Sequence, residues 1–158
     1  RRQRQMCIRD RYNYAGQPWM TQKRIRVLLN QWFRNDLMGV PGDEDGGGMT
    51  AFVVFSMMGF YSVTPGSPTY NIGSPVFKSV KLDLGGGRFF EIIAENYAPD
   101  HKYVQSATLN GKAWNKPWFG QSDIQEGGRL VLQMGEKPDK SWGSAPDAMP
   151  PSSEGLPE

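Results

Sequence analysis

The stretch over residues 49–60, MTAFVVFSMMGF, limits more than any other feature what this chain can fold into. It is apolar on nearly every side and is interrupted only by Thr50, Ser56 and Gly59, and Gly59 is expected to end the helix. A helix without a polar face is buried all round and needs neighbours on several sides. Because the chain supplies few other helices, we expect residues 49–60 to be a buried helix in a fragment of a larger protein.

A second helix is predicted over residues 21–35. Its apolar residues recur with the spacing i, i+3, i+4, i+7, i+8, which is one stripe of an amphipathic helix: Ile25, Leu28, Leu29, Trp32 and Phe33. Thr21 is the expected N-cap, and Pro18 should prevent the helix from extending backwards.

From about residue 70 the pattern changes to strands and turns. Three glycines at 85–87 separate strands expected at 80–84 and 88–94, so this turn is not a nucleotide loop. Asn110-Gly111, a pair that tolerates positive φ, separates two further strands at 106–109 and 112–114. A last strand is expected at 130–134.

These patterns predict an α+β fold, with helices followed by an antiparallel, β-sandwich-like piece. We expect four segments: an arm at 1–11, helices at 12–69, a β-rich region at 70–135, and a disordered or surface-hugging tail at 136–158, rich in Pro, Ser and Gly.

The arm, RRQRQMCIRDR, accounts for the basic character of the chain. It holds five Arg and one Asp, and without it 13 basic and 15 acidic residues remain. An Arg-rich arm can bind nucleic acid or a membrane surface. No recognition helix or interleaved aromatics support this, and no apolar run reaches about 18 residues. We expect neither partner, and we interpret the arm as foreign to the rest of the chain. The single His101 excludes a multi-histidine metal site within the chain.

The acidic loop at residues 41–49, PGDEDGGGM, has four possible functions. A phosphate loop requires Lys and a hydroxyl residue after its last glycine, whereas Gly48 and Met49 stand there. An EF-hand loop starting at Asp43 requires oxygen ligands where Gly47 and Val54 stand. Two interpretations remain: a solvated turn that caps the next helix, or a general-base site in which two close carboxylates, Asp43 and Asp45, raise one pKa.

Several runs resemble glycoside hydrolase family 92, the calcium-dependent exo-acting α-mannosidases. They are YNYAGQPWMTQ (12–22), GVPGDEDGGGMTAFVVFSMMGFYSVTPGSPTYNIGSPVF (39–77), KYVQSATLNGKAWNKPWF (102–119) and DIQEGGRLVLQMG (123–135). The resemblance implies an inverting hydrolase built from a β-sandwich and an (α/α)6 toroid, to which the helices would belong. It also implies that Asp45 is the general base and Asp43 its assisting carboxylate.

The resemblance further implies a Ca²⁺ ion, with no ligands assigned here, and terminal α-mannosides of glycans as substrates, with α-1,2-mannosidase-like activity. It implies secreted or periplasmic localisation in a bacterium and the rest of a parent polypeptide as a partner. The family's general acid is a Glu from a segment that this chain does not match. We therefore expect the chain alone to be inactive.

The alternative function is a non-catalytic carbohydrate-binding module that uses the β-rich region. Trp19, in a loop before a helix, either stacks on a sugar face and binds substrate or packs structurally. Trp114 and Trp118 are expected to pack in the β layer, with a sugar platform as the alternative. Glu91 and Glu95 are expected to be solvated.

Overall fold

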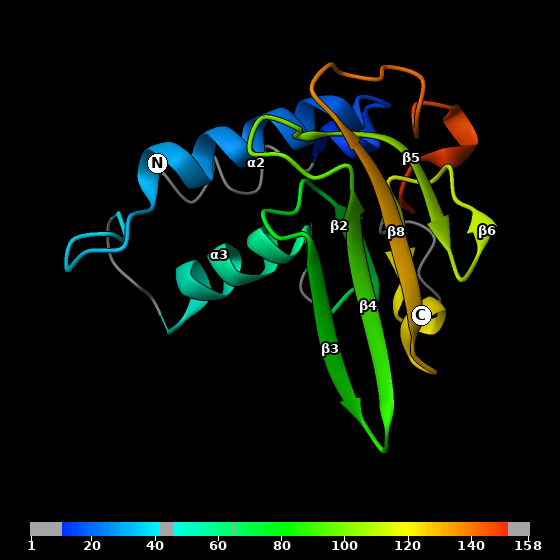
Figure 1. The fold of residues 1–158 in the computed structure, drawn as a ribbon, viewed down its shortest axis with the longest axis horizontal. Coiled ribbons are helices and arrows are strands. Elements are labelled where there is room, and N and C mark those ends of the chain that lie inside the picture. Colours follow the sequence, from blue (N-terminus) through cyan, green and yellow to red (C-terminus); the bar gives the residue numbers. More distant parts are fainter. Residues whose placement is uncertain (1–10, 42–45, 65, 152–158) are drawn as a thin grey trace.

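The structure, a computed structural model, describes residues 11–41, 46–64 and 66–151. Two longer helices come first and strands follow, which confirms the predicted mixed fold (Figure 1). The elements are α2 (Pro18–Trp32), α3 (Gly48–Met58), β1 (Phe60–Tyr61), β2 (Thr69–Ile72), β3 (Ser79–Gly85), β4 (Arg88–Glu95), β5 (Tyr103–Leu109), β6 (Lys112–Ala113), β7 (Trp118–Gly120), α4 (Gln121–Ile124), β8 (Gly128–Gly135) and a 3-10 helix (Pro146–Ala148). Among the described residues, no helix has the length and apolar character needed to cross a bilayer.

The helix α2 begins at Pro18, so the prediction of Thr21 as its N-cap is wrong. Proline is favoured at the first helical position because it has no N–H to leave unpaired and its φ already fits the helix. The buried face is Pro18, Thr21, Gln22, Ile25, Arg26 and Leu29. The predicted stripe is right at Ile25 and Leu29 but wrong at Trp32, which is exposed. The helix turns a partly polar face inward because β5 and the loop after β2 offer it hydrogen-bonding groups.

The helix α3 ends at Gly59, as predicted. Gly59 has a φ of 102°, and its N–H donates to the carbonyls of Phe55 and Ser56, which is a common glycine C-cap. Within this chain the helix is not buried all round, because Val54 is 54% and Phe55 is 37% exposed. Its burial in a larger protein stays a prediction. The described residues cover only the face that carries Met49, Phe52 and Ser56.

The strands form two sheets, one of order β1-β2-β7 and one of order β3-β4-β8-β5-β6. Every pair is antiparallel except β4 and β8, which run parallel from the pair Phe90–Gly128 to the pair Glu95–Gln133. The expectation of an antiparallel piece is therefore wrong at this pair. Parallel neighbours need a long crossover connection, and here β5, β6, β7 and α4 lie between the two strands in the sequence.

One hydrophobic core is built from residues of both sheets. Alternate residues of the central strands are buried: Phe90, Ile92 and Ala94 of β4, and Leu130, Leu132 and Met134 of β8. This is the period of two that a sheet with one buried face requires. From the smaller sheet, Phe119 is fully buried, and its ring centroid lies 5.7 Å from that of Phe90.

The two predicted hairpin turns are confirmed. The glycines at 85–87 all have positive φ and connect β3 to β4. Asn110 and Gly111 have φ of 52° and 79° and connect β5 to β6. Positive φ at both central residues is the requirement of the tight turn that matches the twist of a hairpin.

The described part of the segment after β8 packs on the sandwich through a buried side chain. Trp142 is 5% exposed and belongs to the core between the sheets. Its indole Nε1–H donates to the carbonyl of Trp114 at 3.0 Å. A buried indole gains both apolar contact and a hydrogen bond, so Trp142 helps to hold the described part of the segment, residues 136–151, on the sandwich.

Candidate functional site

The acidic loop leads directly into α3. Asp43 and Asp45, the predicted helper and base, lie outside the described residues, so the structure shows the flank of the loop from Gly46 onward. Gly46 and Gly47 have φ of 66° and 86°, a region that glycine adopts without a steric penalty. A Cβ added at either glycine would meet no atom within 4 Å. The flank thus borders open space, where another molecule could approach the backbone.

The helix that follows the loop is anchored at its core face and at its C-terminal end. Phe52 is fully buried, with its ring centroid 5.8 Å from Phe33 and 5.5 Å from Tyr61. Beyond the last turn, the N–H of Gly73 donates to the carbonyl of Gly59 at 2.8 Å. These contacts connect α3 both to α2 and to the smaller sheet.

Arg26 joins α2 to the loop after β2, a contact that the sequence pattern did not indicate. Its Nε–H donates to the Ser74 hydroxyl at 2.9 Å and its Nη2–H to the Pro75 carbonyl at 2.6 Å. Arg26 is 8% exposed, and burial lowers the pKa of its guanidinium, opposed by the nearby Tyr97. An arginine in an amphipathic helix is usually exposed to solvent. The sequence therefore gave no indication that Arg26 is buried.

Trp19 lies in the first turn of α2, at the end away from the acidic loop. The chain reaches the loop only after the opposite end of this 15-residue helix, which is roughly 22 Å long. Trp19 is half-buried, and the Nζ of Lys140 lies 5.4 Å from its ring centroid. The structure therefore brings Trp19 beside the segment after β8 and not beside the flank of the loop. Its role in substrate binding stays a prediction.

The carboxylates of the β-rich region do not form a second acidic site. Glu91 accepts two hydrogen bonds from the guanidinium of Arg129, at 2.8 and 3.0 Å, and Glu95 is exposed. In the described ranges, no three His, Cys, Asp or Glu side chains are grouped in a way that could hold a metal ion.

The tryptophans of the β-rich region have structural contacts. The indole of Trp114 donates to the carbonyl of Trp118 at 2.9 Å, and the indole of Trp118 donates to the carbonyl of Ala148 at 3.0 Å. Trp114 also packs on the core between the sheets. These contacts support the predicted packing role. Trp114 also lines a pocket between β5, β6 and the segment after β8.

The chain is similar to proteins of one family. The model of the glycosyl hydrolase family 92 catalytic domain matches residues 5–136, a range that includes part of the arm predicted to be foreign. A protein of Arthroderma benhamiae, described as an uncharacterized secreted glycosidase, is 36% identical over 144 residues, which is 89% of this chain and 18% of that protein.

Two solved structures from Bacteroides thetaiotaomicron share the fold. The family GH92 α-mannosidase BT3965, in complex with mannoimidazole, is 34% identical with a TM-score of 0.88, over 94% of this chain and 20% of that chain. The GH92 inverting mannosidase BT2199 is 39% identical with a TM-score of 0.85, over 91% of this chain and 20% of that chain. The chain thus spans about a fifth of the length of these relatives. Because the family model matches most of it, the chain belongs to glycosyl hydrolase family 92.

Proposed function

We propose that this chain is part of the catalytic domain of an inverting, exo-acting α-mannosidase that hydrolyses terminal α-mannosides of glycans, with α-1,2-mannosidase-like activity. The observation that carries this proposal is the match to the family's catalytic domain, which runs through the acidic loop and α3. Two relatives with TM-scores of 0.88 and 0.85 are named as mannosidases, and one of them as inverting.

In the proposed reaction Asp45 is the general base and Asp43 its assisting carboxylate. Asp45 accepts a proton from a water molecule, whose oxygen forms a bond to the anomeric carbon as the glycosidic bond breaks. A carboxylic acid on the other side of the sugar protonates the leaving oxygen. That acid belongs to a part of the domain that this chain does not match, so we expect the 158-residue chain alone to release no mannose.

Two features of the described residues support a base at this position. The glycines before α3 border open space, so a sugar ring could come close to the backbone. The helix itself is anchored through Phe52 and Gly59, so side chains just before it would start from a fixed element. A catalytic group held on a rigid element loses less rate to misplacement.

The exposed apolar surface of the helical part supports a parent polypeptide as the partner. Val54 and Phe55 of α3 are exposed, and the end of α2 and the following loop expose a second group: Trp32, Leu37, Met38 and Val40. Large exposed apolar patches mark surfaces that other structure covers. We propose that the remaining four-fifths of the domain, as its relatives have it, packs on this surface.

Calcium and localisation are part of the proposal on family grounds. Calcium would be held by oxygen ligands and would bind sugar hydroxyls; we assign it no ligands and no step. Secretion is supported by the description of the Arthroderma benhamiae relative as a secreted glycosidase. A bacterial, periplasmic location rests on the sequence resemblance alone.

A chimera tests the function. Residues 12–136 would replace the matching segment of the BT3965 α-mannosidase, and hydrolysis of α-1,2-linked mannobiose would be followed by ¹H NMR. We expect β-mannose to appear first, which is the anomer that inversion produces. Asp45→Asn should lower kcat by about 10²–10⁴-fold, the usual contribution of a general base.

Neighbouring variants provide the controls. Glu44→Gln makes the same change of charge between the two aspartates and should leave kcat close to the parent value. Asp43→Asn should shift the acidic limb of the pH profile to lower pH, because removing a neighbouring negative charge lowers the pKa of Asp45. A folded chimera that stays active with Asp45→Asn would refute the base assignment. A folded but inactive chimera would refute the proposed function.

A further inference from the structure

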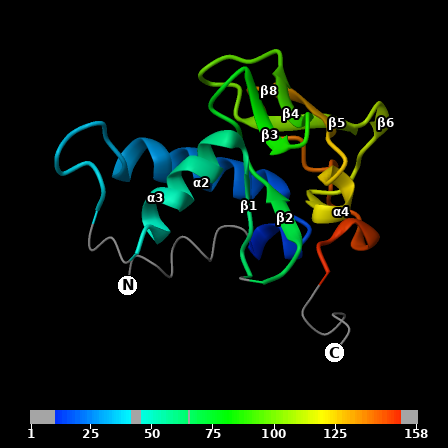
Figure 2. The ribbon, with the colours of Figure 1, turned by 90° about the horizontal axis from the view of Figure 1, so that it is seen from below.

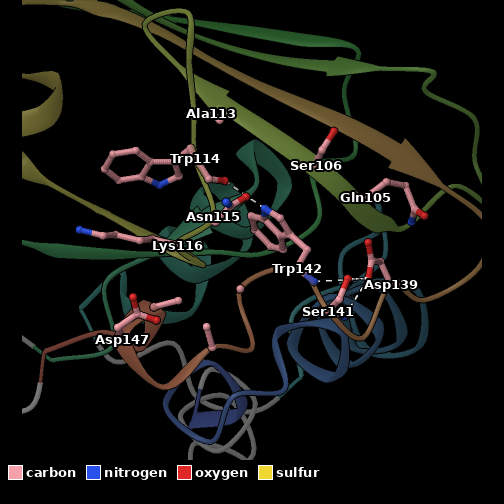
Figure 3. A pocket seen from close by; sticks show the side chains of 13 residues that line it. Gln105, Ser106, Ala113, Trp114, Asn115, Lys116, Asp139, Ser141, Trp142 and Asp147 are labelled. Carbon is pink, nitrogen blue, oxygen red and sulfur yellow. Dashed lines mark hydrogen bonds between the residues drawn. The ribbon is translucent and has the colours of Figure 1, made fainter.

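A pocket of about 630 Å³ lies at the edge of the larger sheet, between β5, β6 and the segment after β8 (Figure 3). Trp142, Trp114, Lys116, Ser141 and Asp147 are among its lining residues. The remaining lining residues are Gln105, Ser106, Ala113, Asn115, Asp139, Gly143, Ala145 and Ala148. All of them come from residues 105–148, so the pocket does not depend on the acidic loop or on α3.

The aromatic walls of this pocket are fixed in place. The indole N–H groups of Trp114 and Trp142 each donate to a backbone carbonyl. Asp139 fixes the adjoining turn, because its Oδ1 accepts from the N–H and the hydroxyl of Ser141 at 2.7 and 2.6 Å. Rings held this way lose little conformational freedom when a ligand packs on them, which favours binding.

The polar groups of the pocket are of mixed kind. Lys116 supplies donors, Asp147 supplies acceptors, and the amide of Asn115 supplies both. All three residues are exposed. The Nζ of Lys116 lies 5.4 Å from the ring centroid of Trp114 and 5.1 Å from that of Trp118, so it covers part of the tryptophan surface. An anionic ligand would meet Asp139 and Asp147, and a wholly apolar ligand would leave these polar groups without partners.

A ligand that suits these walls must have an apolar face for Trp114 and hydroxyls that both donate and accept. A neutral pyranose ring has both, since its C–H face packs on indole rings and its hydroxyls match carboxylate, amide and ammonium groups. We propose that the Trp114–Asn115–Lys116 wall and Asp147 bind a neutral hexopyranose unit of a glycan, at a site separate from the reaction.

The pocket is remote from the flank of the acidic loop. In Figure 1 the start of α3 lies at one end of the long axis, and β6 lies at the other. Figure 2 shows the same separation after a quarter turn. A sugar held in this pocket is therefore not the one being cleaved. The site would bind another branch of the same glycan or hold the enzyme on a glycan-covered surface.

NMR of the 158-residue chain tests the proposal, with methyl α-D-mannopyranoside and mannotriose as probes. The five Trp give five indole N–H signals. The signals of Trp114 and Trp142 should shift with sugar concentration, whereas that of Trp32, on the helical part, should stay in place. Asn115→Ala and Asp147→Asn should each weaken binding about fivefold, the effect of losing one hydrogen bond.

Asp100→Asn is the matched control, because it removes an exposed carboxylate outside the pocket, and it should leave the affinity unchanged. Dispersed indole signals in every variant show that the fold is kept. Sugar that shifts no indole signal, that shifts only Trp32, or that binds all variants alike would overturn the proposal. Because the assay involves no cleavage, its failure is distinguishable from inactivity of the chimera.

Discussion

Replacing Trp142 by alanine should remove the most deeply buried tryptophan contact among those that hold the segment after β8 on the sandwich. Trp142 is 5% exposed and lies in the core together with residues of both sheets. Its indole also donates to the Trp114 carbonyl at 3.0 Å. The substitution therefore leaves a cavity in the core and an unpaired carbonyl beside it.

The expected loss can be worked out from these contacts. A buried tryptophan removes roughly 150–250 Å² from water, which at about 25 cal/mol per Å² corresponds to roughly 4–6 kcal/mol. Measured tryptophan-to-alanine changes in cores cost about 3–5 kcal/mol. We expect Trp142→Ala to lower the free energy of unfolding by about 4 kcal/mol. Trp142→Phe keeps most of the ring but loses the N–H donor, and should cost about 1–2 kcal/mol.

Urea denaturation, followed by far-UV circular dichroism, measures both values. Trp32→Ala is the matched control at a more exposed tryptophan, and it should cost less than half as much as Trp142→Ala. Limited proteolysis should cut between residues 136 and 151 in Trp142→Ala and spare the parent chain. A loss below about 1 kcal/mol, typical of a surface substitution, would refute the docking of this segment.

Three further predictions concern the remaining contacts. Gly59→Ala should lower the free energy of unfolding by about 2–4 kcal/mol, because alanine is strained at a φ of 102° and its Cβ would lie 2.9 Å from Pro75 Cβ. Gly66 also has a positive φ but borders open space, so Gly66→Ala should show only the backbone-strain part of this loss in the same urea experiment. Arg26→Met should cost about 1–3 kcal/mol by leaving the buried Ser74 hydroxyl unpaired, and adding Ser74→Ala should recover part of that loss; no recovery would contradict the assigned bond. Asp139→Ala should lower Tm at pH 7, because hydrogen bonds from Ser141 hold the pKa of Asp139 below its usual 3.8. A lowered folded pKa gives stability above the unfolded value that is lost as pH falls through the folded one, so the two melting curves should converge in acid, and a constant difference would contradict this.

The local features of this fold could be predicted from the sequence. Gly59, the triglycine and the Asn110–Gly111 pair each fix a backbone conformation within a few residues, and the structure confirms all three. The alternation in β4 and β8 is equally local, because each strand buries every second residue. Such signals depend on φ and on side-chain period, which neighbouring residues largely determine.

The contacts that could not be predicted join residues far apart in the chain. Arg26 meets Ser74, and Trp142 meets Trp114. The parallel pairing of β4 with β8 also depends on a crossover whose path no local pattern specifies. The candidate site follows the same division. The composition of the acidic loop left both a capping turn and a base-bearing loop open, and only the family resemblance favoured Asp45 and Asp43.

The anchoring of α3 links the proposed chemistry to assembly of the whole domain. The helix is held through Phe52 and at Gly59, while Val54 and Phe55 on its outer side are 54% and 37% exposed. Whatever packs on that outer side adds a second constraint on the helix from which the acidic loop extends. Since a misplacement of about 1 Å can cost 10²-fold in rate, substitutions at Val54 or Phe55 in an assembled enzyme should lower kcat although neither residue touches the sugar. The proposed pocket at Trp114 lies on the opposite side of the molecule from α3, and none of its lining residues belongs to that helix. Sugar binding there should therefore survive when catalysis does not.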